Sequence, residues 1–145
     1  MKKSILFGTL VASSILLSGC GTKTLSCSKI ETADGYSANE TVEAKFVGNE
    51  VTNFKLSMTM TLDDEFKDNM DLFKSMLEEQ FSSYKNKDGL KFEINSKNDI
   101  EIDLVLDADL KKMSDDDKKE LDFIDTKGSY EATKKEFEDD GYTCK

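Results

Sequence analysis

Cys20 carries the most specific chemistry in this sequence, because of the residues that precede it. The chain begins with the basic stretch Met1-Lys2-Lys3, continues with an apolar run from Ile5 to Leu17, and places the small residues Ser18 and Gly19 directly before the cysteine. That order is typical of an export signal ending at a cleavage site, and the run is too short for a membrane-spanning helix. A thiol at this position is a candidate for acylation.

The sequence Leu17-Ser18-Gly19-Cys20 resembles a bacterial lipobox. The resemblance implies a diacylglycerol group on the Cys20 sulfur, cleavage before Cys20 and, usually, a third acyl chain on the new amino terminus. Two or three acyl chains anchor a protein stably, whereas one binds only marginally. We therefore expect residues 1–19 to be a cleaved lipoprotein signal peptide, and the mature protein to lie on the extracytoplasmic face of the cell membrane, with membrane lipid as its partner through Cys20. The alternative is an ordinary secreted protein whose signal ends near a cysteine.

Two further cysteines, Cys27 and Cys144, lie near the two ends of the mature chain. Outside the cytoplasm such thiols are expected to pair. Closing this loop of 118 residues would stabilise the fold by roughly 5 kcal/mol in the chain-entropy description. Two free thiols or a metal pair are the alternatives, but neither cysteine belongs to a Cys-x-x-Cys motif and the chain has no histidine. We expect a Cys27–Cys144 disulfide.

Composition limits the chemistry that the other residues offer. The chain contains no His, Arg, Trp or Pro and has a net charge of −10; Lys2 and Lys3 leave with the signal, so 18 lysines remain against 30 acids, a charge of −12. Without His there is no Ser-His or Cys-His nucleophile pair, and the commonest metal ligand is missing. An acidic surface repels nucleic-acid phosphates, which excludes nucleic acid as a partner. We expect no catalytic residue, no metal and no cofactor in a protein that is not an enzyme.

Acidic clusters and methionines are the remaining candidates for ligand chemistry. None of the acidic clusters has the spacing of a calcium loop, and we interpret them as helix starts and solvated faces. The clusters are Asp63-Asp64-Glu65, then Asp103, Asp107 and Asp109, then Asp115-Asp116-Asp117, and finally Glu138-Asp139-Asp140. Met58, Met60, Met70 and Met76 could together line a copper(I) site. Because they continue apolar stripes, we interpret them as core side chains instead.

Hydrophobic periodicity defines the elements that must position these residues. Alternation with a period of two predicts strands at 25–30, 40–47, 51–62, 90–95 and 100–106, with Thr52 on the apolar face of the third. Turns are predicted at 32–39, 48–50, 86–89 and 96–99. Between them, residues 63–84 predict one long amphipathic helix. Its apolar stripe is Phe66, Met70, Phe73, Leu77, Phe81 and Tyr84, widened by Met76.

The C-terminal third predicts shorter helices. Ser114 with Asp117 resembles a capping box, and Ser129 begins a helix closed by Gly141. Tyr130, Thr133 and Phe137 are expected to face inward, and residues 142–145 to lie against the first strand as a terminal strand or tail. We therefore expect a short tether at 20–24 and one α+β domain at 25–145. Its antiparallel sheet of about five or six strands, in ββ-α-ββ-α order, carries the long amphipathic helix and the shorter C-terminal helices on one face.

From Ser26 to Lys145 the chain resembles the YehR-like family of small bacterial lipoproteins. The resemblance is carried by Leu25-Ser26-Cys27-Ser28-Lys29, Tyr84-Lys85-Asn86-Lys87-Asp88-Gly89-Leu90, Ala108-Asp109-Leu110-Lys111-Lys112 and Gly141-Tyr142-Thr143-Cys144-Lys145. It implies two antiparallel strand pairs separated by a helix, followed by helical C-terminal elements. It brings no assigned activity and no catalytic motif.

These observations together predict a monomeric, membrane-anchored binding or scaffolding module of a bacterial cell envelope, whose further partner is an unidentified envelope protein or small ligand. One alternative is a protein that binds a small cationic ligand or peptide through its acidic face. Another is an envelope hydrolase that uses two carboxylates. A concave pocket with convergent acids would favour the first alternative. Two close, buried carboxylates with a raised pKa would favour the second.

Overall fold

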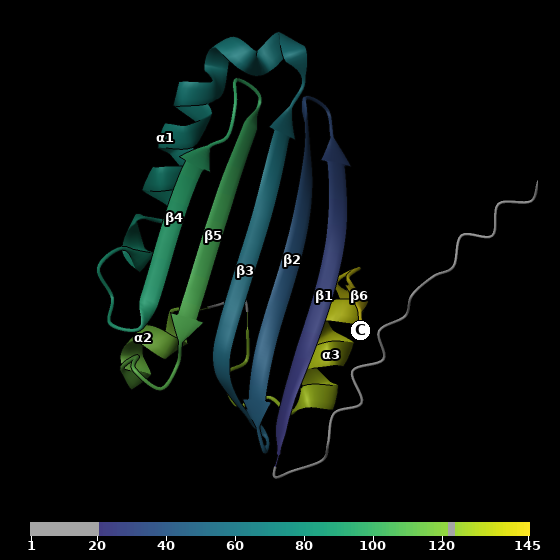
Figure 1. Ribbon diagram of the computed structural model, residues 1–145, viewed down its shortest axis with the longest axis vertical. Helices are drawn as coiled ribbons and strands as arrows, with labels where there is room; N and C mark the ends of the chain where they lie inside the picture. Colours follow the sequence, from purple (N-terminus) through teal and green to yellow (C-terminus); the bar gives the residue numbers. More distant parts are fainter. Residues whose placement is uncertain (1–20, 122–123) are drawn as a thin grey trace, which may run out of the picture.

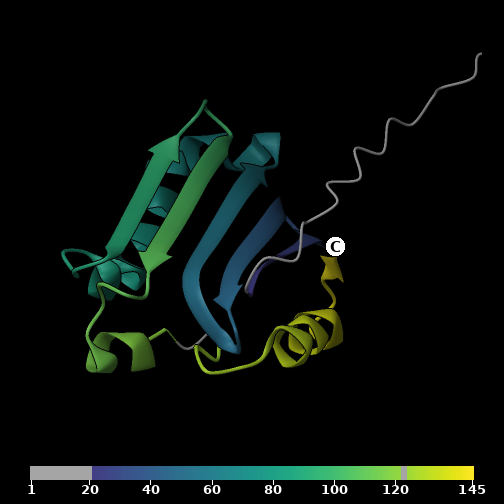
Figure 2. The same cartoon turned by 60° about the horizontal axis from the view of Figure 1, so that its bottom comes forward.

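The computed structural model describes residues 21–121 and 124–145. Within these ranges the chain forms one six-stranded antiparallel sheet with the order β4-β5-β3-β2-β1-β6. The helices lie behind this sheet in Figure 1 and behind or below it in Figure 2, so they cover one face and leave the other open. The predicted α+β class is confirmed.

The elements follow one another with short connections. The strands are β1 Thr22–Ala33, β2 Tyr36–Val47, β3 Glu50–Leu62, β4 Leu90–Ser96, β5 Glu101–Asp109 and β6 Thr143–Cys144. The helices are α1 Met70–Gln80, α2 Asp115–Lys119 and α3 Tyr130–Asp139, and the 3-10 segments are η1 Asp64–Asn69 and η2 Ser82–Tyr84. The expected ββ-α-ββ-α order runs from β2 to α3, with β1 before it and β6 after it.

The first hairpin is longer and tighter than its sequence predicts. β1 begins at Thr22, so residues 22–24 belong to a strand rather than to the expected tether. The turn predicted over residues 32–39 is present at its Asp-Gly, but β1 and β2 are joined by Asp34 and Gly35 alone, so its predicted length is wrong. Gly35 has a positive φ of 94°, which glycine adopts at no steric cost, so the chain reverses within two residues and the small polar residues around them continue the ladder.

A β-bulge at the start of β3 changes which side chains face the core. The register with β2 shifts beside Lys45, where Asn53 pairs with Lys45 but Val51 pairs with Phe46, which leaves Thr52 as the extra residue. Val51 is consequently buried, while Thr52 is half-buried and its hydroxyl donates to the Lys45 carbonyl. The placement of Thr52 on the apolar face is therefore wrong, because one inserted residue reverses the alternation.

The helix predicted over residues 63–84 is divided into η1, α1 and η2. η1 carries Asp64, Asp68 and Asn69, whose side chains compete for backbone hydrogen bonds and weaken a regular helix. Phe66 packs directly over Gly35, which holds η1 across the end of the sheet. The predicted stripe is nonetheless confirmed, because all six of its side chains contact the two core clusters.

Two hydrophobic clusters fill the covered face. The larger lies among β1–β5, α3 and the chain around α2, and it includes Phe46, Phe54 and Leu106. The smaller lies under η1 and α1. Met60 and Met70 are buried in the smaller cluster and Met58 packs against it, as expected of core residues. Met76 is 58% exposed, so its predicted place in the stripe is wrong: it points to solvent one turn after exposed Leu72.

The C-terminal helices begin as their sequences predict. The Ser114 hydroxyl accepts a hydrogen bond from the Asp117 backbone N–H, and the Ser129 hydroxyl accepts one from the Ala132 N–H. Thr133 and Phe137 are buried and Tyr130 packs against the larger cluster. β6 then pairs with the middle of β1. The apolar residues of the segment 108–124 predict inward contacts at Leu110, Met113, Leu121 and Phe123; the first three are buried, and Phe123 lies outside the described residues.

Candidate functional site

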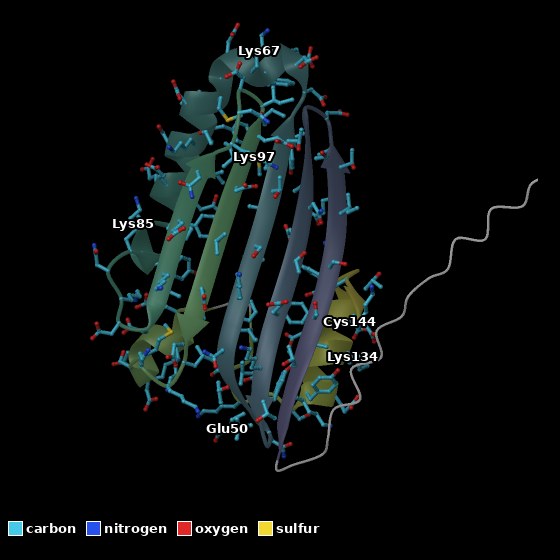
Figure 3. The ribbon with its side chains drawn as sticks, in the orientation of Figure 1. Glu50, Lys67, Lys85, Lys97, Lys134 and Cys144 are labelled. Carbon is cyan, nitrogen blue, oxygen red and sulfur yellow. A yellow bond between two sulfur atoms is a disulfide. The ribbon has the colours of Figure 1, made fainter. Side chains whose placement is uncertain are left out.

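We define the two ends of the sheet, near and far, by their position relative to Gly21, where the described chain begins. The near end contains the start of β1 and the β2–β3 turn, and the Gly48 N–H donates to the Gly21 carbonyl there at 3.0 Å. The far end contains the β1–β2 turn, η1 and the β4–β5 turn, where the Asp63 N–H donates to the Gly35 carbonyl. Glu50 marks the near end and Lys67 the far end in Figure 3. Cys20 lies outside the described residues, and its neighbour Gly21 is at the near end.

Cys27 and Cys144 face each other directly across the β1–β6 ladder and form a disulfide with an S–S distance of 2.01 Å. Their Cα atoms are 4.0 Å apart and they are separated by 117 positions in the sequence. The Lys145 N–H adds a bond of 2.9 Å to the Ser26 carbonyl. The disulfide therefore ties the last residues of the chain to its first strand.

Tyr142 forms a polar contact that the sequence does not indicate. Its hydroxyl donates a 2.5 Å hydrogen bond to the Glu40 carboxylate, 102 positions earlier. Its ring meets the Phe137 ring edge-on at 5.2 Å and carries the Lys29 ammonium 5.5 Å above its centre. Burial first, and then the bond to Glu40, raise the pKa of Tyr142 well above its ordinary value. The phenol thus stays protonated and acts as a donor rather than as a base.

Lys87 joins the turn before β4 to α2. Its ammonium lies 2.7 Å from Asp117 and 2.6 Å from Glu120, and its side chain is only 15% exposed. Hydrogen bonds to these two carboxylates raise the pKa of Lys87, and the Lys87 ammonium, helped by the Ser114 hydroxyl, lowers the pKa of Asp117. Part of the acidic 115–117 cluster is therefore structural, which agrees with its expected role at a helix start.

An acidic hollow of about 430 Å³ opens at the far end, between the η1–α1 junction and the β4–β5 turn. Its carboxylates are Asp68, Asp71 and Asp99, and none of the three forms an ion pair within the described part of the chain. Lys67 is the one basic residue in its lining; Met70, Ser96 and Asn98 complete the lining. Asn98 is fixed because its side-chain amide oxygen accepts hydrogen bonds from the backbone N–H groups of Ile100 and Glu101.

No pattern in the sequence groups these three acids. Asp68 and Asp71 belong to the helical segment and Asp99 to a hairpin about thirty positions later. Only the docking of η1 and α1 on the far end brings them together. Across the described residues, no group of three or more Cys, Asp or Glu side chains is arranged to hold a metal ion.

The pKa shifts of the carboxyl groups do not support a catalytic pair of carboxylates. The Lys112 ammonium lowers the pKa of Asp109, as Lys87 lowers that of Asp117. Among the described residues, these are the carboxyl groups whose pKa is clearly shifted, and a general acid requires a shift in the opposite direction.

No helix in the described ranges has the length and apolar character needed to cross a membrane.

Comparison with known proteins defines the fold and leaves the activity open. The sequence matches no family model and no curated protein. It is similar to a solved structure described as "NMR structure of the protein from Streptococcus pneumoniae TIGR4", with a TM-score of 0.59 and 15% sequence identity. The similarity covers 100% of this chain and 97% of that chain. At this identity the likeness shows a shared α+β fold alone.

Proposed function

We propose that the protein is a lipid-anchored, non-enzymatic binding or scaffolding module on the outer face of a bacterial cell membrane. The proposal is carried by Leu17-Ser18-Gly19-Cys20, which stands directly before the first strand of the folded domain. β1 begins at the near end and runs toward the far end. An anchor on Cys20 would therefore hold the near end at the membrane and present the far end to the surroundings.

A binding role agrees with the residues that the chain offers. Nearby lysines lower the pKa of two carboxyl groups, Asp109 and Asp117. The sequence has no His or Arg. The YehR-like resemblance is part of the same proposal. The stretch 84–90 that carries it contains Lys87, which joins α2 to the sheet, and Tyr84, whose hydroxyl donates to the Glu120 carbonyl. Both contacts hold elements of the fold together.

The geometry of the sheet edge supports a monomer on the membrane. β4 is an edge strand and could pair with β4 of a second copy. Antiparallel pairing of this kind would place the near end of one copy beside the far end of the other. Two copies anchored in one membrane through Cys20 could not both satisfy that arrangement.

Metabolic labelling with a lipid analogue tests the anchor. Wild-type protein should carry the label and stay with the membrane fraction, whereas Cys20→Ala should carry none and should appear as precursor or in the medium. Ser26→Ala serves as a matched control, because Ser26 lies in the same segment and on the open face of β1. The absence of lipid from the wild-type protein would refute the anchor.

The acidic hollow supports a second candidate function, which is recognition of a small cationic ligand or a lysine-rich peptide. Three carboxylates that form no ion pair in the described chain surround one concave surface and attract positive charge, and an amine can also donate to the Ser96 hydroxyl. Calorimetric titration with spermidine and with trilysine tests this function. Binding should weaken as salt rises, since exposed charges are screened within about 8 Å at physiological ionic strength. It should also weaken in the variant Asp68→Asn/Asp71→Asn/Asp99→Asn.

The control for that triple variant removes the same charge elsewhere. Glu43, Glu131 and Glu136 are exposed, and none of them forms an ion pair in the described ranges. Glu43→Gln/Glu131→Gln/Glu136→Gln should bind either probe nearly as wild type does. Equal weakening in both triple variants would show general attraction to an acidic protein and would eliminate the hollow as the binding site.

A further inference from the structure

A second hollow, of about 270 Å³, lies at the near end and has the opposite character. Its apolar floor is Val51 and Leu110, and its polar rim includes Thr52 and Thr126. Glu50, also in the lining, is two residues from Gly48, whose N–H bonds the Gly21 carbonyl. Figure 3 shows Glu50 at the end of the sheet where the described chain begins. The hollow is therefore close to the position that follows Cys20.

Three lysines line this hollow, and each comes from a different segment: Lys111 from the turn after β5, Lys118 from α2 and Lys127 from the loop before α3. The far-end hollow has one lysine in its lining, and the two hollows beside β4 that contain Lys91 have two each. In a chain with a net charge of −10 such a concentration is a local exception.

Main-chain hydrogen bonds hold two of these segments against β3. The Leu110 N–H donates to the Thr52 carbonyl at 3.0 Å, which fixes the residue before Lys111. The Val51 N–H donates to the Thr126 carbonyl at 3.3 Å, which fixes the residue before Lys127. The lysines are thus carried on a positioned backbone, so little ordering of the main chain is needed when a ligand binds.

Most of the positive charge is available to a ligand. Lys118 lies 3.4 Å from Asp115, whose side chain is 93% exposed. Lys111 and Lys127 form no ion pair with any described residue, and Glu50 and Asp115 are the acids in the lining. Lysine ammonium groups donate three hydrogen bonds each and bind phosphate oxygens as compact charges. A hydroxyl such as that of Thr126 can donate to the same oxygens.

We propose that the near-end hollow lined by Lys111, Lys118 and Lys127 binds a phosphate group, supplied by the headgroup of an anionic lipid. The lipid source rests on the proposed anchoring of Cys20, which would bring this hollow to the membrane surface. Inorganic phosphate has the same chemistry and is the second source that the test must separate. Binding would orient the anchored domain and would direct its acidic far end away from the bilayer.

Lysine labelling of the mature, acylated protein on vesicles tests the proposal. The vesicles contain phosphatidylcholine alone, phosphatidylcholine with phosphatidylglycerol, or phosphatidylcholine with inorganic phosphate in solution. Reductive methylation followed by mass spectrometry gives a rate for each lysine. With phosphatidylglycerol, the three hollow lysines should react about five-fold more slowly, the effect expected for a lysine held at an anionic surface. Lys74 in α1 should not change.

The labelling rate of Lys45 is the control that distinguishes binding in the hollow from mere proximity to the membrane. This lysine is exposed and lies near the end of β2 by the near end, outside the hollow. Protection of the three hollow lysines but not of Lys45 supports the proposal, and the same protection by inorganic phosphate assigns the source to free phosphate. Equal protection of Lys45 and Lys118, or protection of neither, overturns it.

A pair of variants completes the test. Lys111→Gln/Lys127→Gln should remove the protection of Lys118, whereas Lys45→Gln/Lys55→Gln, which removes the same charge, should leave it intact. Loss of protection in both variants would refute a specific hollow. Failure of the wild-type protein to sediment with any vesicle would instead refute the anchor, and the inorganic phosphate arm would still test the hollow in solution.

Discussion

The Tyr142 hydroxyl donates a 2.5 Å hydrogen bond to the Glu40 carboxylate, which connects the last turn of the chain to the middle of β2. The contact lies beside the disulfide, because Tyr142 is only two positions before Cys144. Lys29 covers the Tyr142 ring and pairs with Glu31 on the same strand. A polar cluster and a covalent bond thus fix the same C-terminal segment.

Removing the Tyr142 hydroxyl should destabilise the fold. Tyr142→Phe keeps the ring contacts but leaves Glu40 without its donor, and a hydrogen bond to a charged group is worth about 1.5–3 kcal/mol. Partial exposure of both groups reduces this, so we expect a loss of about 1 kcal/mol in urea unfolding. Tyr130→Phe is the control, since the Tyr130 hydroxyl forms no hydrogen bond in the described chain and that change should cost less than half as much. An unchanged unfolding midpoint for Tyr142→Phe would show that the bond is not maintained in solution.

The raised pKa of Tyr142 predicts a loss of stability in alkali. Folding favours the protonated phenol, so this contribution is fully present below the ordinary tyrosine pKa of 10.0 and is lost as pH rises through the folded pKa. Ultraviolet titration should show a phenol step above this ordinary value, and that step should be missing from Tyr142→Phe. Loss of a step near pH 10 in Tyr142→Phe, with the rest of the titration unchanged, would contradict the prediction.

Reducing the Cys27–Cys144 disulfide should strongly destabilise the fold. The two cysteines are separated by 117 positions, and the chain-entropy description gives about 5 kcal/mol for a loop of that size, with measured losses of about 2–5 kcal/mol. Urea unfolding with and without reductant measures the loss. Cys27→Ala/Cys144→Ala should unfold as easily as the reduced protein and should not respond to reductant. A wild-type protein that is indifferent to reductant would show that the two thiols are not paired.

Local signals in this sequence were sufficient for most of the fold. The stripe from Phe66 to Tyr84, and the helix starts at Ser114 and Ser129, depend on residues within a few positions of one another, so periodicity and capping identify them. The bulge at Thr52 could not be foreseen in this way. It depends on which β2 residue lies opposite: Phe54 and the strand residues after it keep the predicted alternation, and the inserted residue changes only Val51 and Thr52.

The candidate sites depend on contacts between distant segments. Asp68 and Asp71 resemble any acids on a helix surface until the β4–β5 turn brings Asp99 beside them. Lys111 and Lys127 likewise resemble solvated lysines until α2 and the loop before α3 fold against β3. Thirty acids and 20 lysines allow very many such groupings, and composition does not select among them.

Lys87→Gln should weaken the attachment of α2 in a pH-dependent way. The Lys87 ammonium lowers the pKa of Asp117, so the stabilisation is present above the ordinary aspartate value of 3.8 and is lost as pH falls through the folded pKa. In the variant, carbon-detected NMR titration should show Asp117 ionising closer to 3.8. The variant should unfold more easily than wild type at neutral pH and about equally in strong acid. Lys85→Gln, at an exposed position without an ion pair, should match wild type at both pH values.

Gly89→Ala should be far more damaging than Gly48→Ala, although both glycines have a positive φ, of +79° and +63°. A side chain in the left-handed region costs roughly 1–2 kcal/mol at either position. At Gly89 an added Cβ would also lie 2.6 Å from the Asp109 carbonyl oxygen and 2.9 Å from the Lys112 Cβ, whereas nothing lies within 4 Å of one at Gly48. Forcing β4 away from that contact should add about 1–3 kcal/mol. Thermal unfolding of the two variants measures the difference directly, and equal destabilisation would mean that β4 approaches Asp109 less closely than the structure shows.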